Sequence, residues 1–262
     1  MQLVRSDLDF ILNQVQFEFA GLTPVRPMPP RESGSHKLGH RSNHSGRPDS
    51  RAARSIRAVF RLSGDPVELI ATDNSFTPDA KIYAENDSAD RIHMVISGTV
   101  RTYRVPGDGR RQIGAFYLPG DTFGLELGET RRCAAEAVTH ARLLLMERQS
   151  ITALAERDRD IARRLWEITA RALQRAEDHA FVLTKSAQER VAAFLMEMAE
   201  RNSTGDVLQL PMSRLDIADY LGLTMETVCR TLKQLEKNGA IALRPSRRLS
   251  IRDRSALLGQ NA

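Results

Sequence analysis

The feature that most constrains this chain is the segment 210–241, LPMSRLDIADYLGLTMETVCRTLKQLEKNGAI, which predicts two helices joined by a tight turn. Ser213 is suited to cap the first helix, with Asp216 three residues later, close to a capping box. Gly222 stands where a left-handed residue would end that helix, and Thr224 is a suitable N-cap for the second. We expect the apolar face of the first helix to consist of Leu215, Ile217, Ala218 and Leu221. This pattern indicates a DNA-binding helix-turn-helix.

The second helix of this segment has an apolar face and a polar face. The apolar stripe has i, i+4, i+7 spacing and consists of Val228, Leu232 and Leu235. The polar strip consists of Glu226, Cys229, Arg230 and Lys233. Arginine can hold the O6 and N7 atoms of guanine, and glutamate can accept from the amino group of cytosine. The alternative is an ordinary i,i+4 surface ion pair between Glu226 and Arg230. We favour base reading, because the alternative would make the preceding helix and turn accidental.

The segment closely resembles the winged helix-turn-helix of the CRP/FNR transcription regulators. The match is closest to the FixK/FNR branch, whose motif is nearly reproduced by DIADYLGLTMETVCRTLKQL. The resemblance implies that Glu226 and Arg230 are the base-reading pair. Cys229 joins them at a position where many members have Ser, and Met225 stands where CRP has Arg. FNR-type half-sites with the sequence TTGAT are implied in the same way.

Positive charge is concentrated in the same part of the chain. Between residues 210 and 254 there are nine Lys or Arg and five Asp or Glu, and the whole chain carries a formal charge of +5. Phosphate binding requires such a concentration. The segment AIALRPSRRLSIRD predicts a hairpin, the wing, with its turn at Pro245-Ser246. Together with the resemblance, this predicts the phosphate-contacting residues Ser213, Arg214, Thr224, Thr227, Lys233, Arg247 and Arg248.

Composition limits the class of protein. A chain of 262 residues can form one or two domains with real cores. It contains no run of 18 apolar residues, so we expect no membrane span. Acidic residues within the apolar pattern of residues 1–20 argue against a signal peptide, which favours a cytoplasmic protein. Two distant cysteines, Cys133 and Cys229, cannot form a disulfide framework or hold an iron–sulfur cluster within one chain. We therefore expect no metal and no cofactor.

The first 55 residues form an N-terminal extension. A short amphipathic helix is expected from Leu8, Ile11, Leu12 and Val15. Residues 31–55 are nearly free of large apolar groups and predict a disordered basic tail. His36, His40 and His44 have the spacing of metal ligands on one helix face, but the glycines between them favour a solvated tail.

Residues 56–148 predict a β-rich domain. Four runs, KIYAEND, HMVISGTVRTYRV, RRQIGAFYLPGDTF and CAAEAVTHARLLLMER, are separated by turn signals at 86–88, 106–109 and 119–121. This spacing suggests a barrel or jelly roll. HMVISGTVRTYR and YLPGDTFG, with Gly98 and Gly120 as turn glycines, resemble the cyclic-nucleotide-binding β-roll of the same superfamily. The predicted fold class is α+β: a β-roll, a long dimerisation helix and a C-terminal winged helix-turn-helix over 185–262.

The segment 120–138 decides whether this β-roll takes a ligand. Nucleotide-binding members are implied to use a Gly-Glu pair for the ribose and a later Arg-Ser for the phosphate. In this chain Gly124 is followed by Leu125, so Glu126 lies one position after the place of that glutamate. The pair Arg131-Arg132 lies before the place of the phosphate-binding arginine and is followed by Cys133 in place of Ser. We therefore expect no nucleotide, and we expect both arginines to lie on a solvated strand edge. An effector-gated regulator that binds a cyclic nucleotide or haem is the alternative.

A catalytic function is not supported. A cupin-like metalloenzyme would need a cluster of His and Glu ligands. His93 and His140 are the histidines of this region, and neither has a partner at ligand spacing. We expect each to be accommodated on its strand.

Residues 149–184 are predicted to be the dimerisation helix. The longest helical pattern, 158–184, has 4–3 spacing, interrupted by Arg175, and gives the seam Ile161, Leu165, Ile168, Ala172, His179 and Val182. The alternative is a helix packed on its own β-roll. The resemblance favours the dimer, because such regulators dimerise here. We expect Trp166 to serve packing, and the next helix, SAQERVAAFLMEMAERN, to belong to the C-terminal domain.

These observations predict a homodimeric transcription activator that partners double-stranded DNA and RNA polymerase and has no membrane partner. The FixK/FNR resemblance implies control of low-oxygen respiration or of nitrogen metabolism, including nitrogen fixation. Cys229 is a candidate redox input, because a thiol near a helix N-terminus and Arg230 is in an environment that favours oxidation. The alternative is an exchange of Ser for Cys without regulatory meaning.

Overall fold

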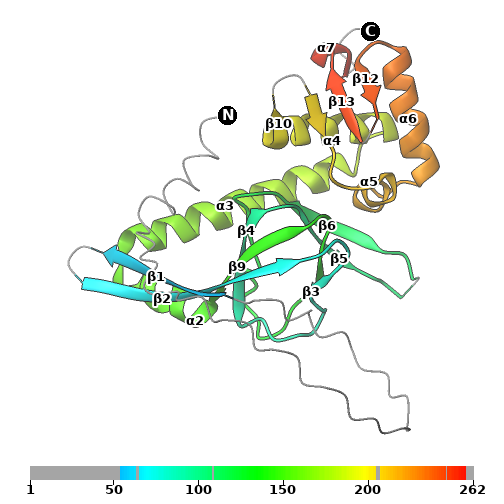
Figure 1. Ribbon diagram of the computed structural model, residues 1–262. Helices are drawn as coiled ribbons and strands as arrows, with labels where there is room; N and C mark the ends of the chain where they lie inside the picture. The colour runs from blue at the N-terminus through cyan, green and yellow to red at the C-terminus, as the bar shows by residue number, and fades with distance from the viewer. Residues whose placement is uncertain (1–53, 63–64, 108, 205–206, 246, 258–262) are drawn as a thin grey trace, which may run out of the picture.

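The computed structural model describes residues 54–62, 65–107, 109–204, 207–245 and 247–257. The expected N-terminal helix, the basic tail and the histidine series His36, His40 and His44 lie outside the described residues. Figure 1 shows a β-roll, a long helix that runs along it, and a smaller helical unit with a sheet beyond the end of that helix. This arrangement confirms the predicted α+β fold class.

The β-roll consists of two antiparallel sheets. One has the order β1 (Arg54–Leu62), β2 (Asp65–Phe76), β9 (Ala141–Glu147), β4 (Arg91–Ser97) and β7 (Thr122–Phe123). The other has the order β3 (Lys81–Tyr83), β8 (Ala134–Ala137), β5 (Val100–Arg104) and β6 (Gln112–Tyr117). The four predicted β-rich runs all contain strands. The fully buried side chains of the roll include Val95, Val100, Ala135 and Leu143.

Strand β1, like β2, precedes the first of the four predicted β-rich runs, which begins at Lys81. The strand pairs with β2 along its whole length, from Arg54 opposite Asp73 to Leu62 opposite Asp65. Its sequence, RSIRAVFRL, alternates polar and apolar residues, which is typical of a strand with one buried face. That alternation was the available signal.

The predicted helical span 149–184 is divided into two helices. Helix α2 (Arg148–Arg157) and helix α3 (Arg159–Val182) meet at Asp158, whose backbone is extended. The Asp158 side chain accepts hydrogen bonds from the backbone N–H groups of Asp160 and Ile161. Asp158 therefore caps α3, and a capping residue with extended backbone cannot continue the preceding helix.

The C-terminal unit is a winged helix-turn-helix, as predicted. It comprises α4 (Ala187–Asn202), α5 (Arg214–Leu221), α6 (Met225–Lys237) and α7 (Arg254–Leu257). Its sheet has the order β10 (Ser203–Thr204), β11 (Val207–Gln209), β13 (Arg248–Ile251) and β12 (Ile241–Arg244). Strands β12 and β13 form the wing hairpin.

The two units share one hydrophobic core. Ile113 and Phe116 of β6, with Leu118, belong to the same buried cluster as residues of α4, α5 and α6. A separate cluster fills the roll between its sheets. No helix within the described ranges has the length and apolar character needed to cross a bilayer. The shared core places the C-terminal unit directly against strand β6.

Candidate nucleic-acid interface

Local hydrogen bonds set the start of both helices of the motif. The Ser213 hydroxyl donates to an Asp216 carboxylate oxygen at 2.8 Å and accepts from the Asp216 N–H at 3.0 Å, while the same carboxylate accepts from the Ser213 N–H. Gly222 ends α5 with a φ of 62°, and the Thr224 hydroxyl accepts from the N–H of Thr227 at 3.1 Å. The predicted caps and turn are therefore confirmed.

The buried face of α5 differs from the prediction at one position. Leu215 is 51% exposed, whereas Ile217, Ala218 and Leu221 are buried as expected. Asp216 and Tyr220 are buried in addition. The buried face of α5 therefore includes Asp216 in place of Leu215, because the Asp216 carboxylate has cationic partners in the β-roll. The spacing of apolar residues in the sequence gives no information about such partners.

Helix α6 presents its polar strip to solvent. Val228, Leu232 and Leu235 are buried, and Thr231 lies with them. On the opposite side, the side chains of Arg230 and Glu226 are 71% and 86% exposed. Their closest charged atoms are 3.9 Å apart, so the surface pair exists, but exposed pairs of this kind contribute little. Both side chains are free to turn outward, which is what base reading requires.

The other predicted residues of α6 differ in exposure. Lys233 is exposed and Cys229 is half-buried with a free thiol. Met225, which was not among the predicted site residues, is 52% exposed at the first position of the helix. An apolar side chain beside Glu226 is suited to contact the methyl group of thymine. The sequence signal that could have identified Met225 is an apolar residue at the start of a helix whose outer face is polar.

The predicted phosphate contacts surround this helix. The hydroxyls of Thr224 and Thr227 are 2.9 Å apart at its start and both lie at the surface. Arg214 is half-buried at the start of α5, and burial lowers the pKa of its guanidinium, an effect that Cys229 opposes and Arg247 reinforces. These interactions mean that Arg214, Cys229 and Arg247 share one electrostatic environment.

The wing is attached to the start of α5 through Arg247. Its guanidinium donates to the Pro211 carbonyl at 3.0 Å, and its own carbonyl accepts from Leu210 at 3.0 Å. Arg248 and Arg244 are exposed and face each other across the hairpin. The wing therefore carries three exposed cations, of which Arg247 is also bonded to the segment before α5.

Two arginines of the β-roll form ion pairs with helix α5 of the helix-turn-helix. Arg101 on β5 and Arg111 before β6 both bind the same oxygen of Asp216, at 3.1 Å and 2.7 Å. Arg111 also pairs with Asp219 at 2.8 Å. Burial opposes ionisation of Asp216, but the hydrogen bonds from Ser213 and the two guanidinium groups lower its pKa below the usual value. Asp216, the acidic member of the capping box of α5, thus also forms ion pairs that join the two units.

Helix α3 has two different faces. The six residues of the predicted seam are all half-buried within this single chain. His179 stacks on Tyr220 of α5 with ring centroids 3.9 Å apart, and Val182 packs against the shared core. By contrast, the large apolar residues Trp166, Leu173 and Phe181 are 74%, 59% and 65% exposed. The predicted seam therefore lies on the half-buried side of α3, as in the alternative of a helix packed on its own chain.

The β-roll contradicts the expectation for Arg131. This residue is 2% exposed, whereas Arg132 is exposed as predicted. Arg131 pairs with Glu126 at 2.9 Å, and this carboxylate makes burial of the charge tolerable. His93 is buried and stacked on Phe123 at 4.9 Å, in line with the expectation of an accommodated histidine. In the part of the chain that the structure describes, no three potential ligands among His, Cys, Asp and Glu gather at one point.

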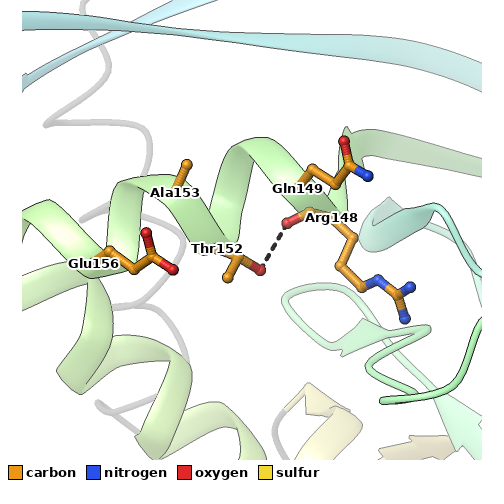
Figure 2. Close-up of a pocket in the computed structure, with 5 residues that line it drawn as sticks. All are labelled: Arg148, Gln149, Thr152, Ala153 and Glu156. Carbon is orange, nitrogen blue, oxygen red and sulfur yellow. Dashed lines mark hydrogen bonds between the residues drawn. The ribbon is translucent and has the colours of Figure 1, made fainter.

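Figure 2 shows a depression on the outside of α2, lined by Arg148, Gln149, Thr152, Ala153 and Glu156. It has a volume of about 230 Å³ and is open to solvent. Its lining comes from one helix, and the Arg148 guanidinium is already bonded to the carbonyls of Glu126 and Gly128, each at 2.6 Å. The depression lacks the enclosed, convergent polar groups of a ligand site.

Comparison with known proteins matches both units. Residues 189–259 match the family model described as a Crp-like helix-turn-helix domain, and residues 73–158 match that of a cyclic nucleotide-binding domain.

Individual relatives match most of the chain. The nitrogen fixation regulation protein FixK of Azorhizobium caulinodans is 44% identical over 220 residues, which are 80% of this chain and 89% of the relative. FixK of Rhizobium meliloti is 42% identical over 190 residues, 72% of this chain and 85% of the relative. The solved structure of FixK2 from Bradyrhizobium japonicum has a TM-score of 0.70 at 46% identity and covers 74% of this chain and 98% of its own.

Proposed function

The chain belongs to the CRP/FNR family of transcription regulators and to its FixK-like branch, and from this membership we propose that it is a homodimeric activator that reads palindromic DNA. It is a DNA-binding regulator and not an enzyme. It acts where the DNA is, in the cytoplasm, and recruits RNA polymerase. The observation that carries the proposal is the exposed pair Glu226 and Arg230 on the solvent side of α6.

Base reading belongs to the exposed strip of α6. Arg230 takes a guanine through its two donor groups, and Glu226 accepts from the amino group of a cytosine. Cys229 and Met225 lie beside them and supply the contacts to thymine methyl groups. Such a set suits a TTGAT half-site, with two half-sites related by the twofold axis of the dimer.

Phosphate binding surrounds the base-reading strip. The start of α5 supplies Ser213 and Arg214, and the start of α6 supplies Thr224 and Thr227. Lys233 and the wing residues Arg247 and Arg248 add cations on the same side. Contacts of this kind fix the register of the protein on the duplex and make its affinity depend on salt.

The dimer seam is best supported on the exposed face of α3. A series with 4–3–4–3–4 spacing, displaced by one residue from the pattern of the predicted seam, is exposed: Ala162, Trp166, Thr169, Leu173, Ala176 and Ala180. Small residues and two large apolar ones at coiled-coil spacing form a stripe that a second copy of α3 can cover. The predicted seam, Ile161 to Val182, then packs on the chain's own domains. This proposal gives Trp166 a place in the seam between two helices.

The named relatives support a proposal for the process that this regulator controls. Two of them are described as nitrogen fixation regulation proteins, which supports a role in low-oxygen, respiratory or nitrogen-fixation control. We expect no effector in the β-roll, and we keep Cys229 as a redox-sensitive thiol next to the DNA. Oxidation there adds negative charge beside phosphate and weakens binding.

The test is selection of bound duplexes from a random pool by the purified protein. The expected result is a palindrome whose half-sites read TTGAT or a close variant and lie about one helical turn apart. Enrichment of single half-sites without symmetry would contradict the dimer, and no enrichment would contradict sequence-specific reading.

A further inference from the structure

The largest fully buried side chain of the β-roll is a cation. Arg131 has a side-chain exposure of 1%, although a guanidinium group is costly to remove from water. Arginine is always protonated in proteins, so the charge cannot be avoided by losing a proton. The chain must therefore provide a site built around this group.

The site is formed by three acceptors from two segments, the loop after β7 and strand β4, and by an aromatic ring on β3. The Nη1 atom of Arg131 lies 2.9 Å from the Glu126 carboxylate and 3.2 Å from the Gly124 carbonyl. The Nη2 atom donates to the carbonyl of Arg91 on β4. The guanidinium carbon lies 4.4 Å from the centre of the Tyr83 ring, a cation–π distance. These are the components with which proteins recognise a planar organic cation.

The backbone at Gly124 is adapted to the same group. Gly124 has a φ of 81°, and a Cβ atom added there would lie 2.6 Å from the Arg131 Nη1 atom and 3.1 Å from His93 Nδ1. A side chain at this position would displace the guanidinium. Only glycine combines this backbone conformation with so close an approach.

The loop that carries Glu126 is held from outside as well. Arg148, the first residue of α2, donates to the carbonyls of Glu126 and Gly128 at 2.6 Å each. Backbone bonds join Arg131 to Asn86 and Asp87 on the neighbouring turn. The 124–131 loop is thus fixed between an inner and an outer guanidinium.

We propose that the β-roll contains a guanidinium-binding site that is permanently occupied by Arg131, so that the chain supplies its own ligand and the roll is ordered without an external effector. This inference concerns the β-roll alone and does not depend on how the C-terminal unit reads DNA. The site would bind a free alkylguanidinium only after the Arg131 side chain has been removed.

The experiment is chemical rescue of Arg131→Ala, followed by thermal unfolding. Truncation leaves the three acceptor groups and the Tyr83 ring without a cation and should lower the Tm by about 5–15 °C. Ethylguanidinium, which replaces the atoms lost, should raise the Tm of this variant in a saturable way at low millimolar concentration, well below denaturing levels. Ethylammonium at the same ionic strength should not, because it lacks the planar fork. The matched control is Arg132→Ala, an exposed neighbour that should show no rescue.

Each outcome decides the proposal. If ethylguanidinium shifts the Tm equally in Arg131→Ala, Arg132→Ala and the wild-type chain, the effect is a general solvent effect and the proposal is overturned. The proposal is also overturned if ethylguanidinium does not shift the Tm of Arg131→Ala. If Arg131→Ala does not fold alone, its refolding yield with ethylguanidinium and with ethylammonium gives the same comparison. A saturable Tm increase of the wild-type chain with cyclic AMP would also overturn the proposal, because the site would then accept an external effector.

Discussion

At the scale of single residues, the arginines of this chain differ in what surrounds them. The Arg230 side chain is 71% exposed and has one distant acidic neighbour. Arg101 and Arg131 are buried and have several acceptors each. A charge of the first kind is available to a partner molecule, whereas charges of the second kind hold the fold. Substitution of an exposed arginine should therefore change the binding of a partner, whereas substitution of a buried one should change the stability of the fold.

Replacing Arg230 by Ala should weaken binding to the preferred duplex by about 1–3 kcal/mol and relax the preference at one base position. The reason is the loss of a two-donor contact to one guanine. Titrations with duplexes that vary one base at a time measure both effects. The matched control, Arg248→Ala on the wing, should weaken all duplexes equally and reduce the salt dependence. A uniform loss for Arg230→Ala would mean that it contacts phosphate only.

Stability should fall as the pH falls below 6.5, in part because of His93. Burial, reinforced by the charges of Arg131 and Arg91, lowers the pKa of His93 to about 3. The unfolded chain therefore binds a proton at this residue before the folded chain does, and stability present above pH 6.5 is lost on acidification. Between pH 6.5 and 5 the loss from this group should be roughly 1.5 kcal/mol.

Urea unfolding at several pH values, compared between the wild type and His93→Phe, measures that contribution. Phenylalanine keeps the stacking on Phe123 but cannot titrate. The wild-type chain should lose more stability than the variant over this range. Parallel curves for the two proteins would contradict the prediction.

Peroxide should inhibit DNA binding through Cys229. The thiol is half-buried on the recognition helix, and an oxidised sulfur there would repel phosphate. Treated wild type should lose affinity, whereas treated Cys229→Ser should keep it. Cys133→Ser, at the other half-buried thiol, should remain sensitive. Equal loss in wild type and Cys229→Ser would remove this role.

At the scale of elements, helix α3 is the one whose two faces have different partners. Leu173→Glu places a charge in the exposed stripe and should convert the dimer to a folded monomer, because a buried unpaired charge in the seam is costly. Gln174→Glu, at the adjacent exposed position, is the matched control and should remain dimeric. Sedimentation equilibrium gives the mass, and circular dichroism shows whether the fold persists. A dimer that tolerates Leu173→Glu would place the seam elsewhere.

At the scale of the whole molecule, Asp216 joins the β-roll to the DNA-binding unit. Asp216→Asn keeps the size of the side chain but removes the charge shared by Arg101 and Arg111. The loss of charge-assisted hydrogen bonds should cost about 1–3 kcal/mol and separate the unfolding of the two units. Calorimetry should show one transition for wild type and two for the variant. Glu85→Gln, which loses only an exposed pair with Arg104, should unfold like the wild type.

The sequence by itself determined the helix-turn-helix and most strands of the β-roll. Caps, turn glycines and apolar periodicity are local, so residues such as Ser213, Gly222 and Thr224 could be assigned from their neighbours alone. The exposed pair Glu226 and Arg230 followed from the same periodicity. Those features depend on contacts within a few residues, which a sequence displays directly.

Only the tertiary structure decided which charges are buried and which face of α3 is free. The sequence predicts a solvated Arg131 because neither the fold of its own loop, which brings Gly124 and Glu126 to it, nor the approach of Arg91 on β4 is visible in local periodicity. Ile161 and Trp166 are both apolar and lie on periodic stripes, and periodicity cannot say which stripe the chain's own domains cover. The burial of a charge or of a stripe depends on groups distant in sequence, because folding alone brings their acceptors and apolar surfaces together.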